Sequence, residues 1–557
     1  MKFAFGVVIA AALLWAATGD HEPGFRLTDV TAQAGISFVH NNGAFGGKYL
    51  PETLGSGAAF LDFDQDGWQD ILLVNGADWP GHKTRRTTMS LYRNNHNGTF
   101  TDVTRRAGLD VEMYGMGVAV GDFNNDGFPD LFVTAVGQSR LFQNTGKSSF
   151  IDVTERSRLG GHSGLSTSAI WLDYDRDGKL DLFVSNYVKW SEAQDVFCSL
   201  DGKRKSYCTP EAYRGSSNWL FHNRGDGTFE DVTAKSGIFD STSKSLGVAM
   251  LDYDRDGWPD LFVANDTQPN KLYRNRRDGT FLDVAVDAGV AFSEDGKARA
   301  GMGVDVADYE NSGFAGIAVT NFDGEMIGLY RGSATGHYSD LAQNSEVGRV
   351  SRRSLGFGCF FFDANLDGLL DLLVVNGHID DTVRNIQPGV RYEQPPHLFV
   401  NGGKQGFYDA AALVGSGFAE PKVGRGAAFG DFDNDGDLDV LVTANHGPAR
   451  LYRNDLVTRK QSIRFRMVGT KSNRDGIGTQ VRIYSGRRYA ALMVKSGSSY
   501  LSQSELPLTF GLGDQNQIDR VVAEWPSGLT ETVTALTAGR YVWTEGHGVK
   551  IDQTNPN

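Results

Sequence analysis

The stretch LDFDQDGWQD at residues 61–70 places four carboxylates around one glycine. Asp62, Asp64, Asp66 and Asp70 stand at positions one, three, five and nine of a D-x-D-x-D-G-x-x-D pattern, with Gly67 at position six. Like charges this close repel one another unless a cation lies between them. Alternating side-chain oxygens, a glycine for a sharp turn and a backbone carbonyl at position seven are ligands that suit Ca²⁺. The alternative interpretation is a solvated acidic turn that holds no ion.

The residues on either side of this pattern exclude an EF-hand. That motif needs a Glu at position twelve and a helix on each side of the loop. Position twelve is Leu73, and the flanking runs GAAFL and ILLVN are short and apolar, which is typical of strands. We therefore predict a calcium loop that joins two strands.

The pattern occurs seven times in the 557 residues, and this repetition predicts the fold. Six copies keep oxygen ligands at positions one, three, five and nine, and we predict about six structural Ca²⁺ sites of weak affinity, with Kd of about 10⁻⁴–10⁻³ M. Their ligands are Asp62, Asp64, Asp66 and Asp70; Asp122, Asn124, Asp126 and Asp130; Asp173, Asp175, Asp177 and Asp181; Asp252, Asp254, Asp256 and Asp260; Asp363, Asn365, Asp367 and Asp371; and Asp431, Asp433, Asp435 and Asp439. The fifth copy has Asp308, Glu310, Ser312 and Gly316 at these positions, and we expect it to be empty or weak.

Each copy belongs to a longer unit with the pattern of four strands. One strand enters the loop, an apolar strand leaves it, a short strand such as LYRN (91–94) ends in Asn, and a strand of the type F-x-D-V follows a hairpin turn. Seven four-stranded units predict an all-β, seven-bladed β-propeller over residues 20–455. The seventh unit lacks its fourth strand, and a spare copy, FRLTDVT (25–31), precedes the first unit. We therefore expect the N-terminal strand to close the ring, and residues 456–557 to form a small C-terminal β-domain.

The N-terminus and the cysteines indicate an exported protein. Residues 1–19 contain Lys2, an apolar run and small residues before Asp20, as in a signal peptide; a membrane anchor is the alternative. No later stretch is long and apolar enough to span a bilayer. Cys198 and Cys208, with nine residues between them, predict a disulfide, the alternative being two unpaired thiols. We expect a secreted or periplasmic location.

The net charge and the absence of common enzyme motifs limit the classes of function that this protein can have. The formal net charge is −14, and removal of Lys2 with the signal peptide makes it −15, which argues against nucleic acid as a partner. The sequence contains no G-x-S-x-G, H-E-x-x-H or Walker A motif. Composition and motifs therefore favour a binding protein over an enzyme.

These units resemble the FG-GAP/VCBS repeats of integrin α-subunit propellers, whose loops of this type bind calcium. Residues from about 455 onward resemble the ASPIC/UnbV family, which includes the cartilage acidic proteins. The matching phrases in that region are NRDGIGTQVRIYSG (473–486), SGSSYLSQSE (496–505), FGLG (510–513) and WPSG (525–528). Two earlier phrases, GISFVHNNGAFGGKYLPETLGSG (35–57) and NGH (376–378), also resemble that family. The resemblance implies a secreted calcium-binding architecture and supplies no enzymatic activity.

Loop length indicates which face binds a partner. The loops between second and third strands lie opposite the calcium loops, and they are long at residues 75–90, 185–219 and 376–397. Long loops on a rigid scaffold, with exposed aromatic and basic side chains, suit contact with a protein or glycan. The alternative is that the aromatic side chains fold under their own loops. The candidate contact residues are Trp79, Arg85, Trp190, Lys203 and Arg391, with Trp219 as a further aromatic residue.

Two functions follow from this arrangement. The first is a secreted scaffold or adhesion-type module that binds an extracellular protein or glycan. The second is an exported enzyme that acts on a polysaccharide or another extracellular substrate at the propeller channel mouth. Its candidate ligand-binding or acid/base residues are His40, Glu52, His378 and Asp380. We favour the scaffold. The tripeptide Arg224–Gly225–Asp226 occupies a hairpin-turn position, and we interpret it as a turn.

Overall fold

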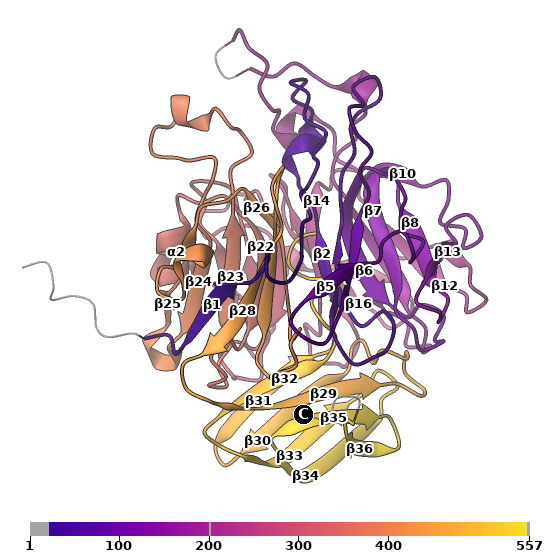
Figure 1. Cartoon of the computed structure of the whole chain (residues 1–557), viewed down its shortest axis with the longest axis vertical. Helices are drawn as coiled ribbons and strands as arrows, with labels where there is room; N and C mark the ends of the chain where they lie inside the picture. The colour runs from indigo at the N-terminus through magenta and orange to yellow at the C-terminus, as the bar shows by residue number, and fades with distance from the viewer. Residues whose placement is uncertain (1–21, 200–201, 554–557) are drawn as a thin grey trace, which may run out of the picture.

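The computed structural model describes residues 22–199 and 202–553, so the predicted signal peptide lies outside the described residues. The all-β prediction is confirmed, because the described residues form 36 strands and their helices are short. Figure 1 shows a large group of sheets around a common axis and a smaller β-domain against one end of it. No helix among the described residues has the length and apolarity needed to cross a membrane.

The predicted units form antiparallel sheets whose strands follow chain order. Units one to three comprise β2 (Ala58–Leu61), β3 (Asp70–Leu73), β4 (Ser90–Asn94) and β5 (Phe100–Asp102); β6 (Gly115–Gly121), β7 (Asp130–Gln138), β8 (Arg140–Asn144) and β9 (Phe150–Asp152); and β10 (Ser163–Leu172), β11 (Asp181–Asn186), β12 (Trp219–Asn223) and β13 (Phe229–Asp231). Units four to six comprise β14 (Ser245–Leu251), β15 (Asp260–Asn265), β16 (Lys271–Asn275) and β17 (Phe281–Asp283); β18 (Val304–Ala307), β19 (Gly316–Val319), β20 (Gly328–Arg331) and β21 (Ser339–Asp340); and β22 (Gly356–Phe362), β23 (Asp371–Asn376), β24 (His397–Asn401) and β25 (Phe407–Asp409).

The remaining unit, unit seven, takes its strands from both ends of the repeat region. It contains β26 (Gly424–Gly430), β27 (Asp439–Ala444) and β28 (Arg450–Leu456), and β28 pairs with β1 (Phe25–Asp29). The first strand of each unit lies beside the first strand of the next, and β26 also lies beside β2. Units two and three share one sheet, because the end of β7 pairs with the start of β10.

The helices are single turns in the connections between strands. The α-helices are α1 (Ala285–Ala288), α2 (Glu346–Ser351) and α3 (Ser416–Ala419). The 3₁₀ turns are η1 (Leu50–Thr53), η2 (Glu192–Gln194), η3 (Pro210–Ala212), η4 (Ala342–Asn344), η5 (Val383–Asn385) and η6 (Gly403–Gln405).

The asparagine that ends the third strand joins neighbouring units. The side-chain amide of Asn144 donates to the backbone carbonyl of Phe63, in the loop of unit one, at 2.8 Å. The amide of Asn94 donates in the same way to Phe432, in the loop of unit seven, at 2.8 Å. Equivalent bonds are made by Asn223, Asn275, Asn401 and Asn454. Unit five has Gly332 at this place, which supplies no side-chain donor.

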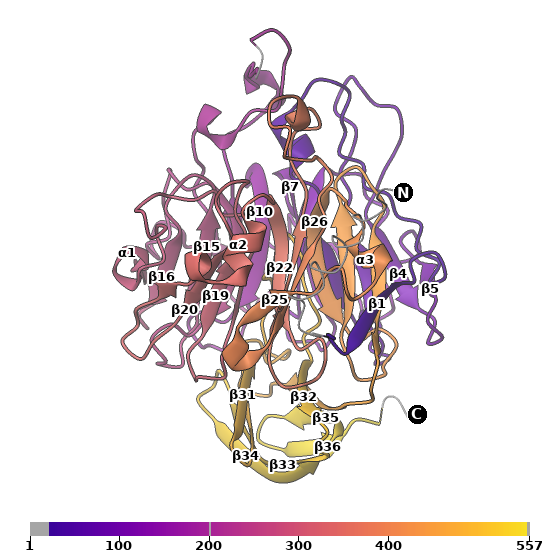
Figure 2. The same ribbon diagram turned by 90° about the vertical axis from the view of Figure 1, so that its left-hand side faces the viewer.

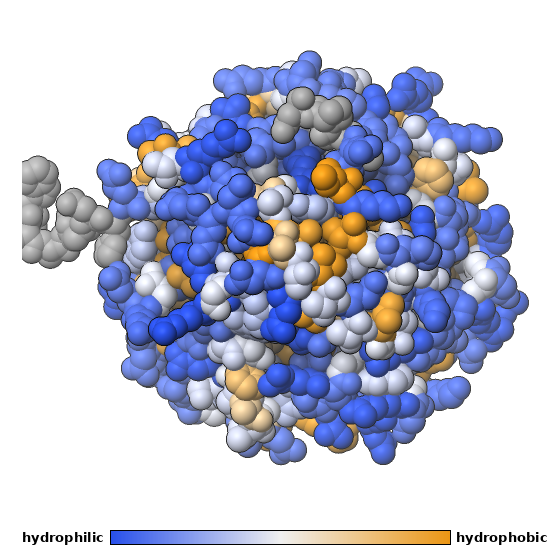
Figure 3. All heavy atoms as spheres, turned by 90° about the horizontal axis from the view of Figure 1, so that it is seen from below, coloured by the Kyte–Doolittle hydropathy of each residue, from blue (hydrophilic) through white to orange (hydrophobic). Residues whose placement is uncertain are grey.

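The C-terminal domain packs two sheets against each other below the repeat units, as Figures 1 and 2 show. One sheet has the order β32 (Leu508–Gly513), β29 (Gln461–Val468), β35 (Gly539–Thr544) and β36 (Gly548–Ile551). The other has the order β31 (Arg488–Met493), β30 (Gln480–Ser485), β33 (Gln517–Glu524) and β34 (Thr530–Thr537). Buried Trp525 and Trp543 belong to the core of this domain. Its lower face is mostly hydrophilic, with a group of hydrophobic side chains near the middle (Figure 3).

A segment of the C-terminal domain, residues 495–505, enters the axis of the repeat units. Residues 496–505 are all buried. Ser499 exchanges two backbone hydrogen bonds with Val304 of β18, at 2.7 and 2.9 Å, and the Leu501 carbonyl accepts from Val118 of β6 at 3.1 Å. Gln503 exchanges bonds with β2 through Ala58 and Phe60. We call residues 495–505 the inserted segment.

Glycine makes this close approach possible. A Cβ added to Gly57, at the start of β2, would lie 1.7 Å from the Leu501 carbonyl oxygen. Gly497 within the inserted segment has φ +72°, and a Cβ there would lie 2.1 Å from Ile170. The side chain of Lys495 forms an ion pair with Asp305, a fully buried acid of β18. The inserted segment therefore fills the axis and ties the C-terminal domain to several units at once.

Candidate metal centres

All seven Asp loops share one backbone conformation. The residue at position four has φ between 51° and 63°, and the glycine at position six has φ between 82° and 100°. A glycine occupies position six because L side chains rarely adopt such angles. In unit one, the two carboxylate oxygens of Asp62 accept the backbone N–H groups of Asp66 (3.0 Å) and Gly67 (2.9 Å). The same pair of bonds recurs in units two to six.

The position-nine Asp links its loop to the rest of the unit. Asp70 begins β3 and accepts the N–H of Phe63 at 3.1 Å and that of Asn94 at 2.7 Å. The equivalent Asp130 and Asp181 are also fully buried. Burial raises the pKa of Asp130 to about 9 and that of Asp181 to about 7, because a buried carboxylate loses its hydration.

The position-one carboxyls are similarly perturbed. Burial and the neighbouring carboxylates together raise the pKa of Asp62 and Asp122 to about 7, that of Asp173 and Asp363 to about 8, and that of Asp252 to about 6. A bound cation would compensate these buried charges, and each loop offers it several oxygens. The residues present therefore fit a hard divalent cation.

Four of the loops bring acidic oxygens within 4.8 Å of one another, as in a group that can hold a metal ion. These groups are Asp62, Asp64 and Asp66; Asp173, Asp175 and Asp181; Asp252, Asp254 and Asp260; and Asp431, Asp433 and Asp439. Two loops also contain buried carboxylate oxygens with no hydrogen-bond partner, namely Oδ1 of Asp64, Asp431, Asp433 and Asp437. Units two and six have Asn at position three, so fewer acidic oxygens are available there.

The third strand adds a side chain that sequence reasoning missed. The residue before its terminal Asn points to the loop: Arg93 bonds to Asp64 at 2.6 Å and to Asp66 at 2.9 Å. In unit three this residue is His222, whose Nδ1 lies 3.1 Å from Asp181 and which forms a possible ligand group with Asp175 and Asp177. The signal was present in the repeated LYRN phrase, where a basic residue recurs beside the Asn.

Unit five departs from the pattern as its sequence indicates. Asp308 still accepts the N–H groups of Ser312 and Gly313, so the loop keeps its shape. Position nine is Gly316, and Arg331 bonds to Glu310 at 2.8 Å. A guanidinium lies beside the position-three carboxylate, as in unit one, but this loop lacks the buried position-nine acid that the other six have.

The C-terminal domain docks on the face that carries the Asp loops, which the sequence did not reveal. Asp475 accepts the N–H of Asp122 at 2.7 Å, and the N–H of Arg474 donates to the Asn125 side chain at 2.8 Å. In unit seven, Glu505 accepts the N–H of Asp431 at 3.1 Å. The docking contacts therefore reach the loops directly.

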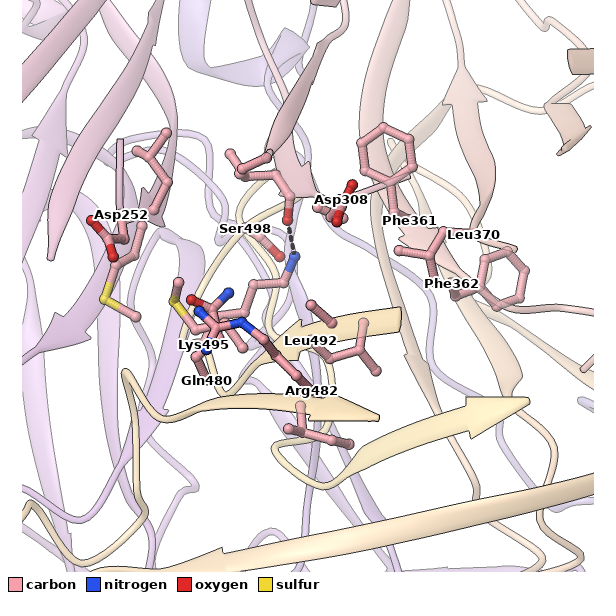
Figure 4. A pocket seen from close by; sticks show the side chains of 18 of the residues that line it. Asp252, Asp308, Phe361, Phe362, Leu370, Gln480, Arg482, Leu492, Lys495 and Ser498 are labelled. Atoms are coloured by element: carbon pink, nitrogen blue, oxygen red, sulfur yellow. Dashed lines mark hydrogen bonds between the residues drawn. The ribbon is translucent and has the colours of Figure 1, made fainter. Parts of the chain in front are cut away.

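A cavity of about 650 Å³ separates the C-terminal domain from units four, five and six. Asp252 and Asp308 reach it from their loops, Phe361 and Phe362 line another wall, and Lys495 extends into it from the C-terminal domain (Figure 4). Lys495 is paired with Asp305, and Arg482, which also lines the cavity, is paired with Glu524 at 2.5 Å. The cavity gives solvent and small ions a route to these loops.

The opposite face carries the three long loops, and one expectation about it is wrong. We call residues 41–53, 75–90, 185–199, 202–219 and 376–397 the crown. Trp79 was expected to be exposed, but only 5% of it is accessible. Its ring stacks on Tyr114 with centroids 4.4 Å apart, and its indole N–H donates to Glu52 at 3.1 Å. The indole N–H of Trp79 and the buried carboxylate of Glu52 thus serve as each other's hydrogen-bond partners. Trp79 therefore lies in the interior of the crown. Trp190 and Trp219 are half-buried.

The other residues that the sequence suggested as ligand or partner contacts on this face are either buried or exposed. Glu52 is fully buried and also accepts from the Tyr207 hydroxyl at 3.0 Å. His40 and His378 are buried, and their Nδ1 atoms accept backbone N–H groups at 3.2 and 3.0 Å. Burial is the main cause that lowers the pKa of His40 to about 3 and that of His378 to about 4. The exposed candidates are Arg85, Lys203 and Arg391.

A disulfide braces the unit-three part of the crown. Cys198 and Cys208 are bonded, with their Cα atoms 5.3 Å apart. Cys359 is a free, buried thiol in β22.

The raised carboxyl pKa values predict an unusual pH dependence for the metal-free protein. A carboxyl whose pKa is higher when folded than when unfolded stabilises the fold at low pH, and this contribution is lost as pH rises through the folded value. In chelator, the melting temperature should therefore fall as pH rises from about 4, the ordinary pKa of an Asp carboxyl, through the folded values near 6, 7 and 8. Millimolar Ca²⁺ should raise the melting temperature most at pH 8. Differential scanning calorimetry checks this, and parallel pH profiles with and without Ca²⁺ would contradict it.

Comparison with known proteins agrees with these features. Residues 62–133, 122–184, 194–263 and 252–319 match the FG-GAP-like repeat family, and residues 469–550 match the ASPIC and UnbV family. Cartilage acidic protein 1 of Xenopus tropicalis is 25% identical over 486 residues, which cover 85% of this chain and 61% of the relative. Integrin alpha-7 of Mus musculus is 30% identical over 148 residues, 25% of this chain and 12% of the relative.

Among solved structures, a complex of BBS1N with ARL6DN matches 77% of this chain and 97% of its own, with a TM-score of 0.41 and 10% identity. The chain spans about three fifths of the length of the cartilage acidic protein that it matches. The chain thus combines matches to the FG-GAP-like repeat family within residues 62–319 with a match to the ASPIC and UnbV family at residues 469–550.

Proposed function

We propose that this chain is a secreted calcium-binding β-propeller that serves as a scaffold for a protein or glycan partner. The observation that carries the proposal is the recurrence, in four of the loops, of acidic oxygens that lie within 4.8 Å of one another. Four buried carboxylate oxygens in the loops of units one and seven have no hydrogen-bond partner in the protein. Burying a carboxylate without a partner is costly, and a divalent cation removes that cost.

In this proposal, calcium is structural and occupies the six loops that keep all four ligand positions. The position-one, -three, -five and -nine side chains named above hold the ions, and the Asp308 loop stays empty or weak. The ions neutralise charge where neighbouring units meet, because five of these six loops, all but that of unit four, also accept the Asn side chain of the next unit. Six divalent ions would bring the charge of the mature chain from −15 to about −3.

The proposed architecture is a ring of seven blades over residues 20–455, closed by β1, with a C-terminal β-domain over residues 456–557. Three contacts support closure: β1 pairs with β28, β26 lies beside β2, and Asn94 of the first unit bonds to Phe432 of the last. A closed ring leaves no free sheet edge between its first and last units.

Closure can be tested at the bond between the first and last units. Asn94→Ala and Asn144→Ala remove the same buried inter-unit bond, one at the closing junction and one at an ordinary junction. If the ring is closed, both should lower the free energy of unfolding by about 1–3 kcal/mol, because each leaves a buried carbonyl unpaired. Urea denaturation measures both values. A negligible effect of Asn94→Ala beside a large effect of Asn144→Ala would indicate an open ring.

Export is part of the proposal. The disulfide between Cys198 and Cys208 suits an oxidising compartment, and residues 1–19 have the composition of a signal peptide.

The crown is the proposed partner surface. The C-terminal domain covers part of the loop face, whereas the crown presents exposed Arg85, Lys203 and Arg391 as well as half-buried Trp190. Basic and aromatic side chains on ordered loops suit contact with an acidic protein surface or a glycan. The residues of the enzyme interpretation, His40, Glu52, His378 and Asp380, are buried, and each has hydrogen-bond partners. The inserted segment occupies the axis between the units, so these observations favour a scaffold.

Partner binding should therefore depend on the crown. The triple variant Arg85→Glu, Lys203→Glu and Arg391→Glu should weaken binding at least about tenfold on a glycan array or against extracellular proteins, because it reverses three exposed charges. Its calcium-dependent melting should match that of the parent. The control is Lys147→Glu, Arg276→Glu and Lys404→Glu, three exposed basic residues on hairpins of units two, four and six. Equal loss of binding in both variants would contradict a crown site.

A further inference from the structure

The loop of unit seven differs from the other six in the partners of its position-one carboxylate. In units one to six this Asp accepts two N–H groups of its own loop. In unit seven, Oδ1 of Asp431 has no partner, although Asp431 is fully buried. Oδ1 of Asp433 and Oδ1 of Asp437 are also buried and unpartnered. This loop therefore contains three acidic oxygens that no protein group satisfies.

Unit seven also has one more carboxylate than the repeat pattern supplies. Asp437 stands at position seven, where the pattern requires only a backbone carbonyl, and 4% of it is exposed. Asp431, Asp433 and Asp439 bring ligand oxygens within 4.8 Å of one another. Five carboxylates lie within nine residues of this loop. A divalent ion would balance only two of their negative charges, so a cationic side chain beside the site would still be attracted to it.

That cationic side chain comes from the C-terminal domain. The guanidinium of Arg540, in β35, donates to Oδ2 of Asp431 at 2.6 Å. Glu505, at the end of the inserted segment, accepts the N–H of Asp431 at 3.1 Å and is itself held by Arg464, whose Nη2 lies 2.5 Å from it. The C-terminal domain thus holds Asp431 through its backbone N–H and through Oδ2. Its other carboxylate oxygen, Oδ1, faces no protein partner.

We propose that the unit-seven loop binds a divalent cation through Asp431, Asp433, Asp437 and Asp439, and that Asp431 couples this ion to docking of the C-terminal domain. One oxygen of Asp431 serves the ion and the other serves Arg540. A group held in place by outer contacts binds a metal with less loss of freedom. Coupling is reciprocal, so an ion that fixes Asp431 also strengthens its contact with Arg540. The proposal rests on calcium binding by the loops and adds a ligand, Asp437, and a regulatory contact.

Hydrogen–deuterium exchange of the full mature chain, with and without Ca²⁺, tests the coupling. In the parent protein, Ca²⁺ should slow amide exchange in β35 by about 5- to 150-fold, the usual range of coupling between sites. The double variant Asp433→Asn and Asp437→Asn should lose this slowing in β35, because it removes two ligand charges without touching the C-terminal domain. Slowing in the loops of the other units should remain.

A matched control separates this contact from a general effect of calcium. Asp254→Asn with Asp256→Asn changes positions three and five of the unit-four loop, which is not bonded to Arg540, and should leave the slowing in β35 intact. If the unit-seven variant keeps the slowing, or if Ca²⁺ leaves β35 unchanged in the parent while it protects other loops, the coupling is wrong and calcium binding stands. If Ca²⁺ protects no loop of the parent, both proposals fall.

Discussion

The burial of like charges is the constraint on which this architecture depends. Every unit begins its second strand with a carboxylate or, in unit five, a glycine, and the six carboxylates are almost completely inaccessible. The same residues make the hydrogen bonds that hold the loop to the third strand and, through the repeated Asn, to the neighbouring unit. Replacing these acids with residues that lack a side-chain oxygen would remove these bonds, so oxygen-bearing side chains are needed here even though their charges repel one another. A cation in the loop is the means by which both requirements are met.

The two faces of the molecule are consequently unlike. The loop face is rich in carboxylates, and part of it is covered by the C-terminal domain, which contacts it through Asp475, Glu505 and Arg540. The crown face carries the three longest loops, braced by a disulfide and by the aromatic contacts around Trp79. The inserted segment connects the domain on one face to the segment that follows η1, near the other face, since the hydroxyl of Tyr500 donates to the Leu54 carbonyl at 3.1 Å. Because the C-terminal domain covers part of the loop face, the crown is the face that presents exposed basic residues on ordered loops.

Features that depend on local spacing could be predicted from the sequence. The D-x-D-x-D-G-x-x-D pattern gave the loops, and the alternation of apolar runs gave the four strands of each unit. The spare N-terminal copy indicated the partner of β28, and β1 does pair with it. These predictions share a cause. Each depends either on residues that lie close together in the chain or on a repeat whose copies can be counted in the sequence.

Features that depend on contacts between distant residues could not be predicted. The sequence SGSSYLSQSE (496–505) resembles a motif of the ASPIC/UnbV family. Nothing in its composition indicates that it enters the axis of the repeat units. Trp79 resembled an exposed contact residue because its loop is polar, whereas its partner, Glu52, lies 27 positions earlier. Arg540 and Asp431 are 109 positions apart, and no repeat relates them.

The most direct measurement of the central claim is the position of bound ions. Crystals of the mature protein grown in about 10 mM CaCl₂, above the weak affinities expected of extracellular calcium modules, can be examined by anomalous diffraction at long wavelength. The account predicts anomalous peaks between the acidic oxygens of the six loops that begin at Asp62, Asp122, Asp173, Asp252, Asp363 and Asp431, and none in the loop that begins at Asp308. Six loops without peaks, with their carboxylates bonded only to protein groups, would contradict it.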